Sequence, residues 1–450
     1  MLLFAVGIVA FAFINVGYGL NNKLPVSMVE YLAAFGVLLA GGHVAMRKYA
    51  PYADPLLLPL AALLNGLGIA MIYRLQESGR DGNTGNEILP TSAAATQILY
   101  SAIGIGCLIG VLVLIKEPRV LQRYTYTLGA VGVILIGLPA MLPDSISEVS
   151  ASYGAKIQIA VGSFTIQPEE FAKLALAASF AGYLVAKRDV LALAGRRVLG
   201  IDLPRARDLG PILIAWAASL LLLVFESDIG TSAVFMGLFV AMLYIATSRT
   251  SWLLIGFLMF VIGAFAASKL FGHVGERFDV WLHPFSSANI ADGNSYQTLQ
   301  GLYGLANGGL LGKGLGAGSP SFTPLVQSDF ITTAFGEEIG LAGLMAMLLI
   351  YGLIVQRGLR TAIMVKDPYS KLLAGGLSFM LALQVFVIVG GVSRLIPLTG
   401  ITTPFLSQGG SSLVASWMMI GLLARLSDTA RRPPPRSIQD EGLTQVVTLT

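Results

Sequence analysis

The chain has 450 residues, of which 55% are hydrophobic and 12% are charged, and its formal net charge is +4. Soluble domains carry about 25% charged residues, so this composition excludes an ordinary soluble protein and predicts one that crosses a membrane repeatedly. The small positive charge follows from membrane topology, and no nucleic-acid partner is expected.

Hydropathy predicts about twelve transmembrane helices, because one span needs about 20 mainly apolar residues. The predicted spans lie near residues 2–20, 27–46, 55–73, 97–115, 121–142, 170–186, 209–225, 229–248, 251–271, 331–355, 371–393 and 408–426. We therefore expect an all-α polytopic membrane protein. The one cysteine, Cys107, lies inside a predicted span, so an intramolecular disulfide is excluded.

The distribution of Lys and Arg predicts that both termini are cytoplasmic. On this assignment the cytoplasmic loops hold 20 of the 29 basic residues, as the positive-inside rule requires. The first apolar stretch begins at Leu2 without a basic leader or a clear cleavage site, which favours a retained signal anchor.

Three segments outside the spans carry further information. Between Pro143 and Pro168, alternating apolar residues predict a short half-buried strand or re-entrant segment, with Pro168 near the first turn of the next helix. The basic segment Lys187–Asp208 is expected to lie at the membrane interface, where it could meet anionic lipid. The largest, from about Gly272 to Asp329, is glycine-rich and lacks a 20-residue apolar run, so we expect a functional outer loop.

Ionisable residues inside spans are candidates for function, because each costs roughly 2.5 to 3.5 kcal/mol on insertion scales. Glu170 and Lys173 are three apart and share a helix face. They form either an ion pair that locks helix packing or a pair that lines a polar cavity. Glu337 and Glu338 lie one turn inside the outer end of a span, so at least one should point to the protein interior.

The outer loop supplies the carboxylates that sugar transfer would need. A hydroxyl that attacks an activated sugar needs a carboxylate to accept its proton, and a diphosphate leaving group favours a divalent cation held by oxygens. Asp292 is the only carboxylate between His283 and Asp329, although Asp292-Gly293 also suits a solvated turn. Signatures of zinc proteases, phosphate-binding loops, serine hydrolases and paired cysteines are absent from the sequence.

Several motifs occur in an order that resembles the SEDS (shape, elongation, division, sporulation) family over about residues 55 to 428. The most specific run is Gly390–Gly400, which continues through Pro404–Ser407 and Gly409–Ser412. The other matches are Ile166–Lys173, Glu226–Thr231, Tyr296–Gln300, Gly312–Gly316, Ser328–Ile331 and Gly336–Gly340.

The resemblance also divides the chain. The family core has ten helices, expected here within residues 51–428, with the large outer loop between the ninth and tenth helices of the whole chain. Residues 1–50 are then two additional N-terminal helices, as in actinobacterial members of the RodA type, which the stretch Ala50–Leu75 also resembles. Residues 429–450 are expected to form a disordered cytoplasmic tail.

The resemblance implies a peptidoglycan glycosyltransferase of the bacterial cytoplasmic (inner) membrane that polymerises lipid II for cell elongation and shape, with an outward-facing site. The implied reaction is inverting, and undecaprenyl diphosphate leaves. The implied partners are a class B penicillin-binding protein, which crosslinks the strands, and the surrounding membrane lipid. A divalent cation, Mg or Mn, is the implied cofactor.

The family pattern points to Asp292 as the catalytic aspartate and as a metal ligand. It lies between Trp281–Pro284 and Tyr296-Gln297, as the family's aspartate does, although residues 285–291 replace the usual Asp-Pro and add about three residues. The candidate cavity and substrate-binding residues are Glu170, Lys173, Arg277, Gln297, Asp329, Glu337, Arg394, Ser407 and Ser411.

Two other functions fit a chain of this type. A lipid II flippase or another transporter would also use many helices and buried charges, but the sequence shows neither a repeat of two halves nor broken helices at mid-membrane. A noncatalytic scaffold of the cell-wall complex is the third reading, and the altered aspartate segment favours it somewhat.

Overall fold

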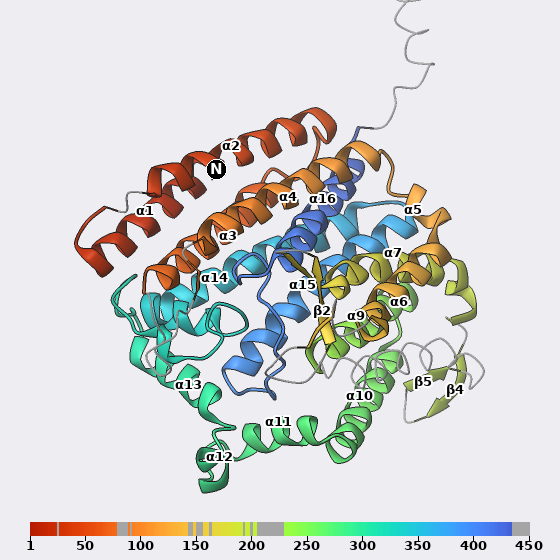
Figure 1. Cartoon of the computed structure of the whole chain (residues 1–450). Helices are drawn as coiled ribbons and strands as arrows, with labels where there is room; N and C mark the ends of the chain where they lie inside the picture. Colours follow the sequence, from red (N-terminus) through yellow and green to blue (C-terminus); the bar gives the residue numbers. More distant parts are fainter. Residues whose placement is uncertain are drawn as a thin grey trace, which may run out of the picture.

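The computed structural model describes residues 1–24, 27–78, 89–90, 92–142, 147–149, 156–161, 164–191, 194–198, 201–204 and 229–433. Long helices dominate this part of the chain and lie side by side in one bundle (Figure 1). They are α1 (Leu2–Asn21), α2 (Met28–Tyr49), α3 (Leu57–Glu77), α4 (Ala93–Leu114), α6 (Thr125–Met141), α7 (Pro168–Leu191), α9 (Ile229–Thr247), α10 (Thr250–Leu270), α14 (Ile331–Met364), α15 (Pro368–Val392) and α16 (Gly410–Arg431).

The predicted all-α membrane fold is confirmed. Within the described ranges, nine helices are long and apolar enough to cross a membrane. The predicted spans 121–142 and 170–186 correspond to helices α6 and α7, which are not among these nine. The predicted span 209–225 lies outside the described residues, so the total of twelve stays a prediction. Apolar side chains around the whole circumference suit helices that are surrounded by lipid and by other helices.

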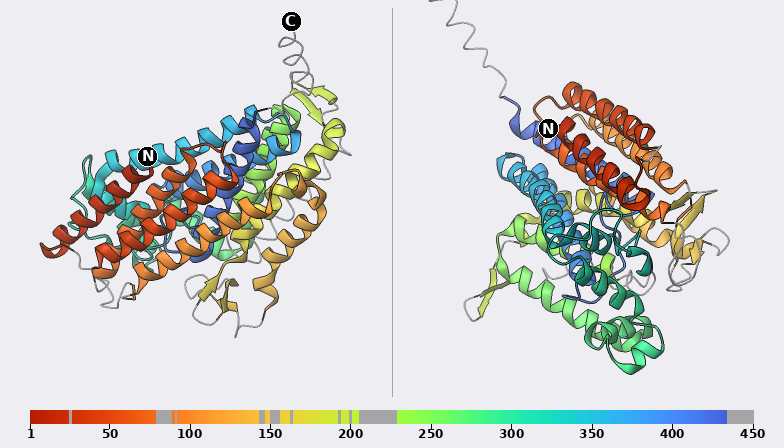
Figure 2. Two further views of the ribbon diagram at one scale, coloured as in Figure 1. Left: turned by 90° about the horizontal axis from the view of Figure 1, so that it is seen from above. Right: turned by 90° about the vertical axis from the view of Figure 1, so that its left-hand side faces the viewer.

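Burial separates central helices from peripheral ones. The apolar windows of α3, α15 and α16 are 78%, 72% and 89% buried, whereas those of α2 and α10 are 22% and 17% buried. Figure 2 shows α1 and α2 along one side of the bundle, and α10 also lies at its periphery (Figure 1). The core is therefore built around α3, α15 and α16 together with α9, whose apolar window is also 72% buried, and the helices at the edge present their apolar faces to lipid.

Two small sheets interrupt the helices. Strands β1 (Ser147–Val149), β2 (Lys156–Val161) and β3 (Phe164–Ile166) form an antiparallel sheet in that order, with Ile159 opposite Ile166. The strand predicted before Pro168 is confirmed, and α7 begins at Pro168, whose fixed φ suits the first turn of a helix. Strands β4 (Ala194–Val198) and β5 (Ile201–Pro204) pair antiparallel within the basic segment, whose contact with lipid stays a prediction.

The segment from about Gly272 to Asp329, predicted as an outer loop and here called the outer segment, is mostly helical. It contains α11 (Gly272–Leu282), α12 (Ser287–Ala291), α13 (Tyr296–Gly308) and the short 3-10 helix η2 (Pro320–Phe322). Ser286 caps α12, because its hydroxyl accepts a hydrogen bond from the Asn289 amide at 3.2 Å. In Figure 1, α11 runs from the lower end of α10 toward α12 along the lower edge of the molecule. The hydropathy of this segment excludes a membrane span but does not exclude shorter helices. The helices found here are too short to cross a membrane.

The opposite end of the bundle holds a buried ionic cluster. Asp428 of α16 is fully buried and accepts hydrogen bonds from the Tyr52 amide at 2.9 Å and from Arg432 at 2.7 Å. Asp54 is also buried and pairs with Arg431. These contacts fix the connection between α2 and α3 to the end of α16. The short helix α5 (Val120–Arg123) completes the described helices on the connection before α6.

Candidate outer active site

A cavity of about 400 Å³ lies between α11, α13 and the connection from α15 to α16. Three of the predicted site residues, Arg277, Gln297 and Arg394, line it together although they are far apart in sequence. Asn294 and His273 add polar groups to the same wall. These three predicted residues thus line one polar cavity. Its outward orientation and the contact of these residues with substrate stay predictions.

Arg394 forms a reciprocal clasp with Trp281. Its Nε donates a hydrogen bond to the Trp281 carbonyl at 2.8 Å, and the Trp281 indole N–H donates to the Arg394 carbonyl at 3.2 Å. The backbone of Arg394 has a φ of 62°, a left-handed conformation that few non-glycine residues adopt. Arg277 adds a bond from Nη1 to the Thr399 carbonyl at 3.3 Å. The two arginines therefore fix α11 to the connection between α15 and α16.

The charge of the cavity comes from arginine. Burial and the neighbouring Arg277 lower the pKa of His273, so its imidazole is neutral at neutral pH. Arg277 and Arg394 contribute positive charge, and Glu276 contributes one carboxylate. A wall with two guanidinium groups favours an anionic ligand, because each presents planar N–H donors to carboxylate or phosphate oxygens.

Asp292 lies on an exposed turn and is not itself one of the residues that line this cavity. It ends α12, and its amide donates to the Ala288 carbonyl at 2.9 Å. Asn294, two residues later, lines the cavity. Gly293 has a φ of 74° and open space around it. Asp292-Gly293 therefore forms a turn, which the sequence also suggested as the alternative to a catalytic role. The structure thus places the predicted catalytic aspartate near the cavity wall, and its catalytic role stays a prediction.

A second aspartate, which the sequence analysis did not select, has a better-defined environment. Asp279 accepts a hydrogen bond from the Asn289 amide nitrogen at 2.8 Å and lies 3.2 Å from Nδ1 of His283. Asn289 also donates to the His283 carbonyl at 2.9 Å. These contacts join α11 to α12. The four-residue spacing of Asp279 and His283 on one helix was the available signal.

We expect Asp279 to support the outer segment in a pH-dependent way. The bonds from Asn289 and His283 lower the pKa of Asp279 below its ordinary value of 3.8. A carboxyl whose pKa is lower in the folded state stabilises the fold above its unfolded pKa, and this contribution disappears as the pH falls through the folded value. The Tm difference between wild type and Asp279→Asn should therefore be present at about pH 5 and shrink below about pH 4. A constant difference down to pH 3 would contradict this.

Glu170 and Lys173 form a buried ion pair at the start of α7. The Lys173 Nζ lies 2.8 Å from Oε1 of Glu170, and the two side chains are 3% and 5% exposed. Ser411 lies close to this region, because its hydroxyl accepts a hydrogen bond from the Gln167 amide at 2.9 Å. The ion pair expected from their spacing is confirmed. These residues do not line the cavity between α11 and α13, and their contact with substrate stays a prediction.

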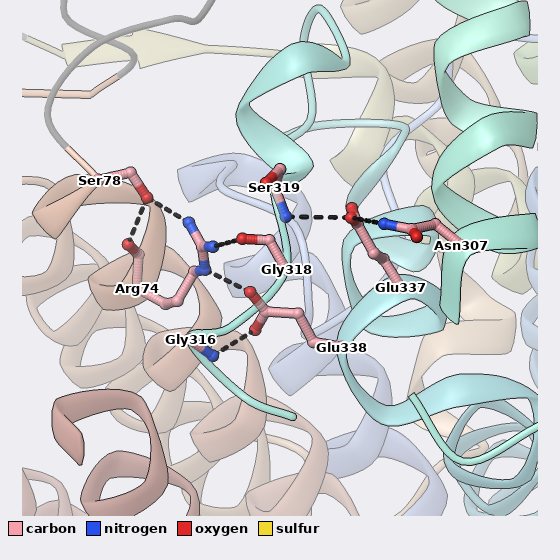
Figure 3. A network of polar contacts seen from close by, with 8 residues as sticks. All are labelled: Arg74, Ser78, Asn307, Gly316, Gly318, Ser319, Glu337 and Glu338. Carbon is pink, nitrogen blue, oxygen red and sulfur yellow. Dashed lines mark hydrogen bonds and ion pairs between the residues drawn. The ribbon is translucent and has the colours of Figure 1, made fainter. Parts of the chain in front are cut away.

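Glu337 and Glu338 are both buried, as predicted for at least one of them. Glu338 forms a short ion pair with Arg74 of α3, with Oε1 and Nε 2.5 Å apart. Its other oxygen accepts a hydrogen bond from the Gly316 amide at 3.0 Å, and Arg74 Nη2 donates to the Gly318 carbonyl at 2.7 Å (Figure 3). Arg74 and Glu338 therefore join α3, α14 and the glycine-rich segment after α13.

Glu337 binds the same segment from its other side. Its Oε1 accepts hydrogen bonds from the Asn307 side chain at 2.9 Å and from the Ser319 amide at 3.0 Å (Figure 3). Asn307 belongs to the last turn of α13, so Glu337 links α13 to α14. The predicted site residue Glu337 thus has a structural role, and a direct substrate contact stays a prediction.

Ser407 and Asp329 lie deeper in the protein. The Ser407 hydroxyl donates to the Ser328 carbonyl at 2.5 Å and accepts a hydrogen bond from the Thr403 amide at 2.8 Å. Asp329 is 4% exposed. These contacts join the end of the outer segment to the connection before α16. The structure therefore does not bring all the predicted site residues into one cavity.

The described residues do not form a metal site by themselves. No group of three or more His, Cys, Asp or Glu side chains in those ranges could hold a metal ion. Asp292 supplies one carboxylate, whereas Mg²⁺ is usually bound through one or two carboxylates, water and substrate phosphates. The residues present therefore do not fit a protein-only divalent site, and any ion at Asp292 would need oxygen ligands from the substrate.

Comparisons with known proteins agree with the fold and the motifs. A family model named for FtsW, RodA and SpoVE and described as a cell cycle protein matches residues 55–432. The chain is 45% identical to the peptidoglycan glycosyltransferase RodA of Mycobacterium tuberculosis, over 96% of this chain and 90% of that protein. It is 30% identical to the stage V sporulation protein E of Bacillus subtilis, over 86% of this chain and 99% of that protein.

Two solved structures share the fold. A chain of a peptidoglycan synthase complex is 22% identical, with a TM-score of 0.55 over 90% of this chain and 98% of that chain. A variant of the Thermus thermophilus rod shape determining protein RodA is 20% identical, with a TM-score of 0.54 over 85% of this chain and 99% of that chain. At this level of identity the two structures support the architecture alone.

Proposed function

Because the chain belongs to the FtsW/RodA/SpoVE family of cell cycle proteins, we propose that it is a peptidoglycan glycosyltransferase that polymerises lipid II into glycan strands for cell elongation and cell shape. The observation that carries this proposal is the identity to mycobacterial peptidoglycan glycosyltransferases over almost the whole chain. The outer cavity supports it, because its arginines and amides suit an anionic, sugar-bearing substrate.

In the proposed reaction the 4-hydroxyl of an acceptor sugar attacks the anomeric carbon of a lipid-linked donor disaccharide. The new C–O bond forms as the bond to the diphosphate oxygen breaks, so undecaprenyl diphosphate leaves with the bonding electrons and the configuration inverts. Asp292 accepts the proton of the attacking hydroxyl, as general bases do in sugar transfer. Arg277 and Arg394, which line the cavity, provide the positive charge that stabilises the departing diphosphate.

The proposed setting is the cytoplasmic membrane. The chain is a multi-pass bacterial membrane protein. We propose that both termini are cytoplasmic and that the cavity faces outward, which the distribution of basic residues supports. A class B penicillin-binding protein is the proposed partner, in line with the shared fold of a peptidoglycan synthase complex. We propose that a Mg or Mn ion binds only together with the substrate diphosphate, and the proposed proton transfer does not depend on it.

The test is polymerisation of lipid II by the purified protein with its penicillin-binding partner, with and without EDTA. Glycan polymer on a gel supports the enzyme, and its loss in EDTA with recovery in Mg or Mn supports the cation. Movement of lipid II across vesicle membranes without polymer would favour a flippase. Neither activity in a protein that still binds its partner would favour a scaffold.

A further inference from the structure

The segment from Gly308 to Ser319, here called the glycine loop, is held tightly against α14. The amides of Lys313 and Gly314 donate to the carbonyls of Glu337 and Glu338 at 3.0 and 2.8 Å. Beyond these bonds α14 bends at a glycine of positive φ, residue 340 (φ 69°). This bend lets the amides of Leu341 and Ala342 bond back to the end of α13 and the start of the loop. These backbone hydrogen bonds therefore fix the face of the glycine loop that contacts α14.

Helix α1 contacts the other side of the glycine loop through backbone atoms. A Cβ atom on Gly19 would overlap the Leu315 carbonyl oxygen and lie 3.0 Å from Gly316 Cα. A Cβ atom on Gly316 would in turn lie 2.9 Å from the Val16 carbonyl. Gly316 also has a φ of 84°, which favours glycine. The approach of α1 to the loop thus requires glycine on both partners.

Helix α1 also packs against α3, and α3 contacts the glycine loop through Arg74. The rings of Phe13 and Tyr73 have centroids 5.5 Å apart, and Tyr31 of α2 lies 5.9 Å from Tyr73. Tyr73 precedes Arg74, whose guanidinium bonds the Gly318 carbonyl and Glu338. Helix α1, the glycine loop and the outer end of α3 therefore form one packed unit.

We propose that helix α1, through Gly19, positions the glycine loop and thereby the cavity for the polymerisation reaction, an inference that rests on the proposed function. Helix α13 makes the connection. Gln297 in its first turn lines the cavity, and Asn307 in its last turn is bound to Glu337. These residues are ten positions apart, roughly 15 Å along a helix. A shift of the loop therefore moves α13 and the cavity wall, and a displacement of about 1 Å can reduce a rate by about 10²-fold.

This role would belong to a part of the chain outside the matched family core. The match to the family model begins at residue 55, and α1 ends at Asn21. Gly19 touches neither the cavity lining nor any proposed reacting group, so it is a positioning residue and not a catalytic one. Its effect on the reaction would have to pass through the glycine loop.

The test compares Gly19→Ala with Gly7→Ala in the full-length protein. Gly7 lies on the same helix and has no atom within 4 Å of an added Cβ, so both variants gain helix propensity but only Gly19→Ala meets the loop. We expect amide exchange in peptides covering residues 308–319 to rise about tenfold in Gly19→Ala and to stay unchanged in Gly7→Ala. We also expect kcat for lipid II, per folded molecule, to fall about tenfold or more in Gly19→Ala alone.

Amide exchange tests the contact between α1 and the glycine loop, and kcat tests the effect of that contact on the reaction. Unchanged exchange in Gly19→Ala, or faster exchange with unchanged kcat, overturns the positioning role. A wild type without polymerase activity overturns the proposed function and the positioning role together, while the exchange result still decides the contact. If Gly19→Ala does not fold, exchange is measured in wild type at increasing denaturant. The glycine loop and the last turns of α1 should then open together, and separate opening overturns the proposal.

Discussion

Replacing Asp292 by Asn should reduce lipid II polymerisation by about 10²- to 10⁴-fold, the usual contribution of a positioned general base. Asn keeps the size of the side chain but cannot accept the proton of the attacking hydroxyl. Asp292 is exposed at the end of α12, so the substitution should change the free energy of unfolding by no more than about 0.5 kcal/mol. The measurement is initial polymerisation rate, with Tm as the control for folding.

The matched control is Asp279→Asn, because Asp279 is the other exposed aspartate of the outer segment. It binds Asn289 and His283 and joins α11 to α12, so its loss should weaken the segment and leave most of the activity. Full activity in Asp292→Asn together with complete loss in Asp279→Asn would transfer the role of base to Asp279. Full activity in both variants would show that neither aspartate acts as the general base.

The second large effect is on stability. Arg74→Ala should destabilise the protein by about 3 to 5 kcal/mol, because it leaves the Glu338 carboxylate buried without its cation. The two side chains are 3% and 0% exposed, so bulk solvent does not screen the pair in the wild type. Unfolding in detergent, followed by circular dichroism, would measure the change. The double variant Arg74→Ala/Glu338→Gln should recover part of the loss, since no unpaired charge remains.

An exposed ion pair in the same chain provides the comparison. Arg119 pairs with Asp367 at 2.6 Å, but its side chain is 65% exposed. Solvent screens such a pair, so Arg119→Ala should cost no more than about 1 kcal/mol. If Arg74→Ala destabilises the protein no more than Arg119→Ala, the joint between α3, α14 and the glycine loop is not a stabilising element.

Local patterns in the sequence predicted the helices well. The apolar stretches predicted the nine described helices that are long and apolar enough to cross a membrane, and the alternation before Pro168 predicted strand β2. Both signals are local, because proline suits the first turn of a helix and alternating apolar residues suit a strand. The short helices α11 to α13 were not predicted, because a length criterion for membrane spans does not detect helices of 5 to 13 residues.

The candidate site was only partly predictable, because its contacts join distant segments. Arg74 and Glu338 are 264 positions apart, and no pattern of spacing connects them. Arg394 was selected from a motif, but its clasp with Trp281 depends on a left-handed backbone that the sequence does not reveal. Asp279, by contrast, has its partner His283 four residues later, directly after the last residue of α11, and this spacing is visible in the sequence.

The clasp with Arg394 also makes Trp281 a natural optical probe. The sequence contains four tryptophans, and two of them, Trp252 and Trp417, are fully buried in the helix bundle. Trp281 forms part of the cavity wall, and its indole N–H is bound to a carbonyl. Because indole emission depends on local polarity, a ligand that displaces water from the cavity would change the fluorescence of this residue. Binding can thus be followed without a label, in a variant that retains Trp281 and replaces the other tryptophans with phenylalanine.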